Sequence, residues 1–399
     1  MTANAAMHAH ISPPLLPVHS IDRAVAPVAW HAPLRDPSGY AEEARHFLFA
    51  LSATGIQAAA RAIRWSDRET TLPPARERLL LRLQALPTQP NSIHVWHILA
   101  PYFNALPDAR ANIGRTMFET DRLPDGWAAA CNRMDAIWVP SEFNRESFAR
   151  AGVCAQKLRV VPGTIDFAAY DPGCEPLQID GARGFNFLSV FDWTLRKGWD
   201  VLIRAFVEEF GPDDDAALIF KVHSSLGYSA QQILESVSAF ISNTLGRDPD
   251  SVGDIVFLDA NLSDSQMPAL YRAADCFVLP SRGEGWGRPY MEAMTMCLPV
   301  IGTAWSGNTA FMTRHNSLLL DCDVVDVPEA GWMETPTYRG HRWAEPCVCH
   351  LRKLMRVAFE DRSAGRETGE RARADLERRF SYCAVGELIA QELAGMCGK

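Results

Sequence analysis

Short apolar runs alternate with longer amphipathic segments along most of this 399-residue chain. Runs rich in β-branched and aromatic side chains predict strands, and segments with apolar residues three or four positions apart predict helices. Regular alternation of the two predicts parallel sheets joined by right-handed crossovers, and hence an α/β fold. We predict strands at residues 25–30, 57–65, 92–99, 111–117, 136–139, 157–161, 185–191, 218–223, 255–258, 276–279, 299–303 and 317–320. We predict helices at residues 40–54, 74–86, 141–152, 200–210, 230–245, 267–275, 308–312, 367–379 and 385–396, with one more opening at Pro289.

The chain is longer than one hydrophobic core usually supports, so we expect two domains. The segment VPGTIDFAAYDPG, residues 161–173, has the proline and glycine content of a linker. We therefore predict an N-terminal domain over residues 25–175 and a C-terminal domain over residues 176–380. Residues 1–24 lack a basic start followed by an apolar core, so we expect a flexible segment and no secretory signal. Residues 323–346, rich in Pro, Gly and Trp, predict an irregular insertion.

Composition narrows the class of protein. Apolar residues make up 47% of the chain, which is typical of a packed globular protein, and the net charge of −9 argues against nucleic-acid binding through a broad basic field. The ten cysteines lack the spacing of a disulfide framework, and no segment has 18 consecutive apolar residues, so we expect a cytoplasmic protein. The basic, leucine-rich helix at 74–86 predicts a docked surface helix; peripheral contact with the inner face of a membrane is the alternative.

The segment at residues 276–307 combines a strand, a glycine loop, a helix and a second strand. Glu284 lies inside the loop, and Glu292 lies in the first turn or so of the helix that Pro289 opens. A glycine loop that leads into a helix N-terminus at the mouth of a parallel sheet presents unpaired N–H groups to phosphate or sugar oxygens. The two carboxylates are then candidates for binding hydroxyls. The alternative is a solvated loop acid and a favourable charge near a helix start.

Two further candidates precede predicted helices. Arg196 and Lys197 stand together before the helix at 200–210, where two cations can neutralise a diphosphate. Gly39 lies in the loop after the first strand, where a glycine lets a substrate approach the backbone, although it can equally be an ordinary turn residue. Cys347, Cys349 and His350 lack a second pair of ligands, so we predict no metal site.

The segment E-G-W-G-R-P-Y-M-E-A-M, residues 284–294, resembles the nucleotide-sugar signature of retaining GT-B glycosyltransferases of the family 4 type. The resemblance implies two Rossmann-like, doubly wound domains facing a cleft, with a C-terminal helix (residues 381–399) that crosses back to the first domain. It implies that Glu284 approaches the donor sugar, Glu292 binds the ribose, and Lys197 contacts the phosphates. The loop Gly285, Trp286 and Gly287 would help to bind the leaving diphosphate. Residues 261–265 would border the base.

The chain departs from the family pattern at two positions. Asp192 stands where the family has an arginine, so we expect Arg196 to take that role. Where many members have a histidine in the N-terminal domain, this chain has Glu119, Thr120 and Asp121, of which Glu119 is our catalytic candidate. We expect the chain to transfer a sugar from a UDP- or GDP-sugar, with retention and without a metal or other cofactor, to a glycan, lipid-linked or small-molecule acceptor. A nucleotide-sugar epimerase and a non-catalytic sugar-binding protein are the alternatives, and the oligomeric state stays open.

Overall fold

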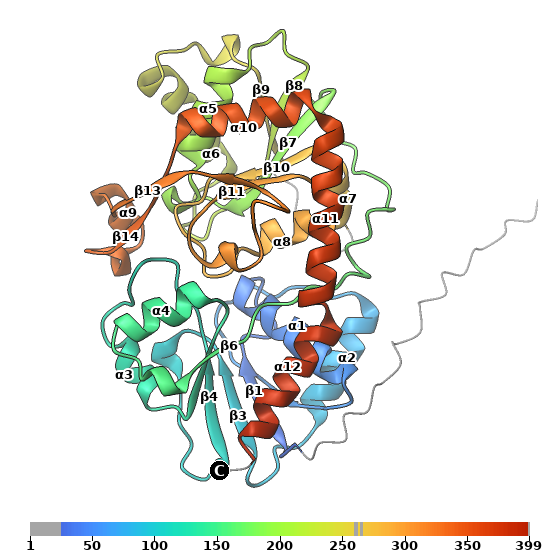
Figure 1. Cartoon of the computed structure of the whole chain (residues 1–399), viewed down its shortest axis with the longest axis vertical. Helices are drawn as coiled ribbons and strands as arrows, with labels where there is room; N and C mark the ends of the chain where they lie inside the picture. The colour runs from blue at the N-terminus through green and yellow to red at the C-terminus, as the bar shows by residue number, and fades with distance from the viewer. Residues whose placement is uncertain (1–24, 259–261, 264–265, 398–399) are drawn as a thin grey trace, which may run out of the picture.

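The computed structural model describes residues 25–258, 262–263 and 266–397, so the predicted flexible segment and most of the predicted base-bordering segment lie outside the described residues. Two α/β units are stacked along the long axis of the molecule (Figure 1). Each contains a parallel sheet that, within the described residues, has six strands, with helices on its faces. The predicted α/β fold with two doubly wound sheets is confirmed.

The N-terminal sheet has the strand order β2-β1-β3-β4-β5-β6, and each neighbouring pair is parallel. Every strand that we predicted in this half is present, with ends that differ by up to three residues. The strands are β1 (Val28–Ala32), β2 (Ala59–Ala62), β3 (Ile93–His97), β4 (Ala111–Arg115), β5 (Ala136–Val139) and β6 (Leu158–Val160). The helices are α1 (Gly39–Ala53), α2 (Pro74–Ala85), α3 (Trp127–Asn132) and α4 (Glu142–Arg150).

The C-terminal sheet has the order β12-β11-β10-β7-β8-β9, again parallel throughout. Its strands are β7 (Phe185–Asp192), β8 (Ala216–His223), β9 (Asp254–Leu258), β10 (Cys276–Leu279), β11 (Val300–Thr303) and β12 (Leu318–Leu320). Its helices are α5 (Trp199–Glu209), α6 (Ala230–Ala239), α7 (Gln266–Arg272), α8 (Arg288–Thr295), α10 (Val348–Glu360) and α11 (Arg362–Phe380).

The prediction of an irregular insertion at residues 323–346 was wrong. This segment forms an antiparallel hairpin of β13 (Cys322–Asp326) and β14 (Arg342–Pro346), with the short helix α9 (Glu329–Glu334) between them. Trp343 and Tyr338 are buried, and they share an apolar cluster with Phe118 of the N-terminal unit. The Pro, Gly and Trp content thus reflects tight turns and a packed core. We call residues 322–346 the hairpin insertion.

The last helix, α12 (Tyr382–Gly395), packs on α1 of the N-terminal unit (Figure 1). A Cβ atom on Gly386 would come 2.5 Å from the carbonyl oxygen of Ala50, so the glycine allows the two helices to approach closely. Ile389 and Leu393 of α12 are buried in the same cluster as Trp30 of β1. The helix therefore completes the core of the unit from which the chain started.

Candidate active site

The order of the C-terminal strands creates a switch point between β7 and β10, and we call the place between the loops that follow these two strands the crevice. The chain leaves β7 toward β8 on one side and β10 toward β11 on the other, so the loops after these strands diverge. In open parallel sheets such a switch point, at the carboxyl ends of the strands, is where ligands bind. Arg196 and Lys197 follow β7, and Glu284 follows β10, so the crevice brings together three of the predicted site residues.

Arg196 and Lys197 lie in a 3₁₀ turn, Leu195–Lys197, directly before α5. Gly198 ends this turn with φ of 69°, and a Cβ atom there would come 2.1 Å from the carbonyl oxygen of Pro280. The backbone N–H of Arg282 donates to the carbonyl of Arg196 at 2.6 Å. Glycine is thus needed for both the left-handed conformation and the contact between the two loops.

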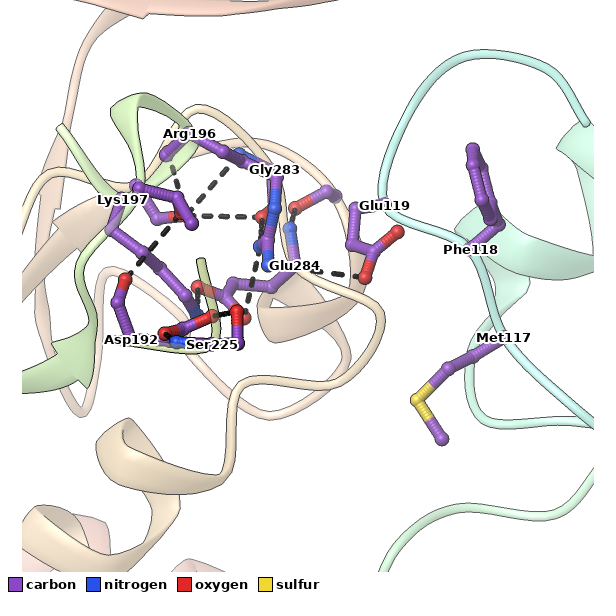
Figure 2. A network of polar contacts seen from close by, with 12 residues as sticks. Met117, Phe118, Glu119, Asp192, Arg196, Lys197, Ser225, Gly283 and Glu284 are labelled. Atoms are coloured by element: carbon purple, nitrogen blue, oxygen red, sulfur yellow. Dashed lines mark hydrogen bonds and ion pairs between the residues drawn. The ribbon is translucent and has the colours of Figure 1, made fainter. Parts of the chain in front are cut away.

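Glu284 pairs with both cations (Figure 2). Its Oε1 atom lies 2.5 Å from Nζ of Lys197, and Oε2 lies 3.8 Å from Nη1 of Arg196, which also donates to the carbonyl of Gly283 at 2.5 Å. Burial alone would raise the pKa of Glu284, but the charges of Lys197 and Arg196 outweigh it and lower the pKa. Burial lowers the pKa of Lys197, against the attraction of Glu284. The carboxylate therefore occupies the place where the two cations would hold an anion.

Glu119, from the loop after β4, reaches this cluster from the N-terminal unit (Figure 2). Its Oε1 atom lies 3.9 Å from Nη2 of Arg196, and its Oε2 atom accepts a hydrogen bond from the hydroxyl of Tyr338 at 3.4 Å. Tyr338 belongs to the hairpin insertion, and we did not predict it as a site residue. The hairpin insertion thus holds the N-terminal carboxylate beside the cations of the C-terminal unit.

The hairpin insertion makes further bonds to both units. The Thr120 hydroxyl and Nδ1 of His341 are 2.7 Å apart, and the Asp121 carboxylate accepts from the N–H of Arg342 at 2.7 Å. On the other side, Glu334 accepts from the N–H of Leu195, the first residue of the cationic turn, at 2.7 Å. These contacts fix the loop that carries Glu119.

Of the predicted loop glycines, Gly285 serves close packing between the two units, and Gly287 starts the following helix. A Cβ atom on Gly285 would come 2.6 Å from Cγ of Met117, and Gly287 caps α8 with φ of 96°. Trp286 is buried, and it packs against Gly163 in the connecting segment. A Cβ atom on Gly163 would come 2.4 Å from Nε1 of Trp286. The structure therefore gives Trp286 a packing role at the connection between the units, and its predicted role toward the diphosphate stays a prediction.

Glu292 lies apart from the first cluster, in a second one that spans both units. It is the fifth residue of α8, just past the first turn and close to its predicted place. Tyr271 donates to its Oε2 atom at 2.8 Å, and Arg288 lies 3.4 Å from its Oε1 atom. The same guanidinium is 2.6 Å from Glu42 of α1. Burial and the charge of Glu42 raise the pKa of Glu292 to about 7, although Arg288 opposes this.

We did not predict Arg288 or Glu42 as site residues, although Arg288 directly follows the glycine loop. Gly39 is the first residue of α1, three positions before Glu42, and a Cβ atom on it would meet no atom within 4 Å. Close packing within the chain therefore does not require a glycine at this position. Its predicted role toward a substrate stays a prediction.

In the described part of the chain no three His, Cys, Asp or Glu side chains are grouped as metal ligands would be. Across the same residues, no helix is both long and apolar enough to span a bilayer. The two clusters themselves consist of cations, carboxylates and phenols.

Residues 184–330 match the model of the family described as "Glycosyl transferases group 1". A curated relative, mannosylfructose-phosphate synthase of Agrobacterium fabrum, is 31% identical over 129 residues, which are 32% of this chain and 27% of the relative. The match thus spans about a quarter of the length of that relative.

Solved structures are similar over nearly the whole chain. HepE of Anabaena, in complex with UDP and glucose, has a TM-score of 0.64 at 15% identity, covering 93% of this chain and all of that one. Sucrose-phosphate synthase of Thermosynechococcus elongatus has a TM-score of 0.63 at 15% identity, covering 94% and 99%. At such identities the likeness establishes the fold. The fold is that of GT-B proteins, and its C-terminal unit is similar to a group 1 glycosyltransferase domain.

Proposed function

We propose that this protein is a glycosyltransferase that transfers a sugar from a nucleotide diphosphate sugar to an acceptor hydroxyl. The observation that carries the proposal is the pair Arg196 and Lys197, which lies before α5 in the crevice between β7 and β10. Two cations and the N-terminus of α5 form a place for a diphosphate. The similarity of residues 184–330 to a glycosyltransferase domain supports the same activity.

The internal pairing of Glu284 suggests how the donor enters. Without ligand, Glu284 neutralises Lys197 at 2.5 Å. A diphosphate carries more charge and offers more acceptor oxygens than one carboxylate, so it displaces Glu284 from Lys197. The released carboxylate then accepts hydrogen bonds from the sugar hydroxyls next to the diphosphate. Glu119 borders the same space from the N-terminal unit.

The two cations should stabilise the transition state more than the bound ground state. The diphosphate gains negative charge as the glycosidic bond breaks, and Arg196 and Lys197 stabilise that charge most in the transition state. We propose that these cations supply the charge that a metal ion would otherwise bring. Glu284 is paired with both of them, so it is poorly suited to act as a nucleophile as in retaining hydrolases. We therefore propose retention by attack from the side of the leaving phosphate, which accepts the proton of the acceptor.

Glu292 and Arg288 are proposed to bind the nucleoside part. Glu292 follows the glycine loop on α8, and its carboxyl group can accept from or donate to ribose hydroxyls according to its protonation. The similar structures bound to UDP and to UDP-glucose make uridine nucleotides the first donors to test. Two similar proteins are named as synthases of sugar phosphates, so sugar phosphates are the first acceptors to test.

A thermal-shift screen tests the donor. A ligand that binds only the folded state raises the melting temperature. The ligands to screen are UDP, GDP, ADP and their glucose and mannose conjugates, and the donor should raise the melting temperature more than the others. Proton NMR of the product then gives the anomeric configuration. The matched variants are Lys197→Ala and Lys353→Ala, because Lys353 is exposed on α10, away from the crevice. If no nucleotide stabilises the protein, or if both variants respond alike, the proposal is wrong. No specific observation favours an epimerase or a non-catalytic binding protein.

A further inference from the structure

A second switch point lies in the N-terminal sheet, where the order β2-β1-β3 makes the loops after β1 and β3 diverge. By the rule that places ligands in the first crevice, this crevice is also a candidate binding place. The loops at this edge reach the C-terminal unit: Glu42 after β1 pairs with Arg288, and Glu119 after β4 approaches Arg196. The carboxyl edges of the two sheets therefore face each other.

Two exposed aromatic side chains stand at this second crevice. Trp65, shortly after β2, is 39% exposed, and Tyr102, in the 3₁₀ turn after β3, is 64% exposed. Their ring centroids are 6.4 Å apart, and Trp65 also lies 5.8 Å from the ring of Tyr40 at the start of α1. An aromatic pair that stays open to solvent leaves a large apolar area uncovered, which often indicates a binding surface.

The surroundings of these rings are rigid. The Tyr40 hydroxyl donates to the carbonyl of Met117 and accepts from its N–H, both at 3.1 Å. Next to Trp65, the Ser66 hydroxyl donates to the buried carboxylate of Asp36, and the N–H of Thr70 donates to the carbonyl of Arg35 at 2.8 Å. The loop that carries Trp65 is therefore tied to the loop after β1. A surface that is already ordered loses little conformational entropy when a ligand binds.

The aromatic pair is continuous with the candidate active site. Tyr40 connects Trp65 to Met117, and Met117 lies against Gly285, next to Glu284. Figure 2 shows Met117 and Glu119 on the same loop, with Glu119 directed toward the cations. A molecule resting on Trp65 and Tyr102 would thus lie along the path to the reacting sugar.

We infer that Trp65 and Tyr102 form a stacking platform for a sugar ring of the acceptor. The inference rests on the proposed function, and it narrows the acceptor to a saccharide. One face of a pyranose consists of C–H groups, which suit an aromatic face, and its rim consists of hydroxyls, which need polar partners. Arg64 and Asp67 beside Trp65 are paired with each other and largely exposed, so both can also bond to hydroxyls of a ligand. A lipid chain would instead require a continuous apolar surface, which these charges interrupt.

The test uses saturation-transfer difference NMR with methyl glycosides and disaccharides of glucose, mannose and galactose as probes. The variants are Trp65→Ala and Tyr102→Ala; Tyr102→Phe keeps the ring, and Leu81→Ala removes a side chain that is 50% exposed on α2, in the same unit. We expect at least one saccharide to show transfer to its C–H face. Its affinity should fall about fivefold to tenfold in the two alanine variants and stay unchanged in the other two, since an aromatic contact contributes on that scale.

Calorimetry with UDP on the same proteins separates this inference from the proposed function. UDP affinity should be equal in wild type and all four variants. If the saccharides show no transfer, or if Trp65→Ala and Tyr102→Ala leave it unchanged, the platform is wrong even when UDP binds normally. If the alanine variants instead lose binding to phosphatidylglycerol vesicles, the aromatic pair contacts membranes and the inference is also wrong. If saccharides bind as expected and UDP does not bind, the platform stands and the proposed donor site fails.

Discussion

Replacement of Glu292 by glutamine tests the charge distribution between the two units. Arg288 carries one positive charge and faces two carboxylates, Glu42 at 2.6 Å and Glu292 at 3.4 Å. Burial would raise the pKa of Glu42, but Arg288 outweighs it and lowers that pKa, whereas the pKa of Glu292 rises to about 7. One guanidinium therefore stabilises one ionised carboxylate, and the other carboxyl group retains its proton.

The effect on stability follows from this difference in pKa. Between the ordinary value of 4.5 and about 7, the folded protein holds the Glu292 proton more tightly than the unfolded chain does. Its contribution to the free energy of unfolding is therefore fully present below pH 4.5 and is lost as the pH rises through 7. At about 1.4 kcal/mol for each pKa unit, the loss amounts to about 3 kcal/mol. Glutamine resembles the protonated acid, so Glu292→Gln should keep this contribution to the free energy of unfolding at every pH.

Urea unfolding followed by tryptophan fluorescence at pH 5 to 8 measures this effect. The quantity of interest is the difference between the variant and the wild type at each pH, because groups other than Glu292 contribute to both proteins. Relative to wild type, Glu292→Gln should become more stable by about 2.5 kcal/mol as the pH rises from 5 to 8, because part of the loss already occurs below pH 5. The second variant is Glu42→Gln, in which Arg288 no longer faces the Glu42 carboxylate and pairs with Glu292 instead. In that background only burial still raises the pKa of Glu292, so this pKa should fall and the pH-dependent difference should shrink. A difference that is constant between pH 5 and 8, or one that is equally large in Glu42→Gln, would refute the reasoning.

Three further predictions concern ligands and turnover. Lys197→Ala should weaken UDP binding about tenfold to a hundredfold, because a charged hydrogen bond contributes about 1.5–3 kcal/mol; equal calorimetric affinities for this variant and Lys353→Ala would contradict it. EDTA should leave transfer nearly unchanged if protein cations stabilise the leaving diphosphate, and loss of activity that Mg²⁺ or Mn²⁺ restores would show otherwise. Glu284→Gln should lower kcat without weakening UDP binding, because Lys197 loses a competing partner. Glu292→Gln should weaken the binding of UDP and of the donor alike. Steady-state kinetics and calorimetry on both variants would contradict this if they showed the reverse pattern.

Local sequence patterns were sufficient for the elements and for the residues that lie within one loop. The apolar run Cys276–Leu279, the glycines and Pro289 predicted the strand, loop and helix that the structure contains. The same holds for Arg196 and Lys197, because the strand–turn–helix that carries them is local. The hairpin insertion was mispredicted because its strands are short and its apolar residues pack against the other unit. Periodicity within the segment contains no information about that partner.

Three side chains that influence the charge of the site, Glu42, Arg288 and Tyr338, were not predicted, because each acts across the two units. Glu42 and Arg288 are 246 positions apart in the sequence, and Tyr338 reaches Glu119 across 219 positions. These pairs also link protonation to the arrangement of the units. If the units separated, Arg288 would lose Glu42 and its charge would be left to Glu292, which would then ionise at neutral pH. The Glu42→Gln variant imitates this loss within the closed structure, so the pKa of Glu292 reports on contact between the units as well as on burial.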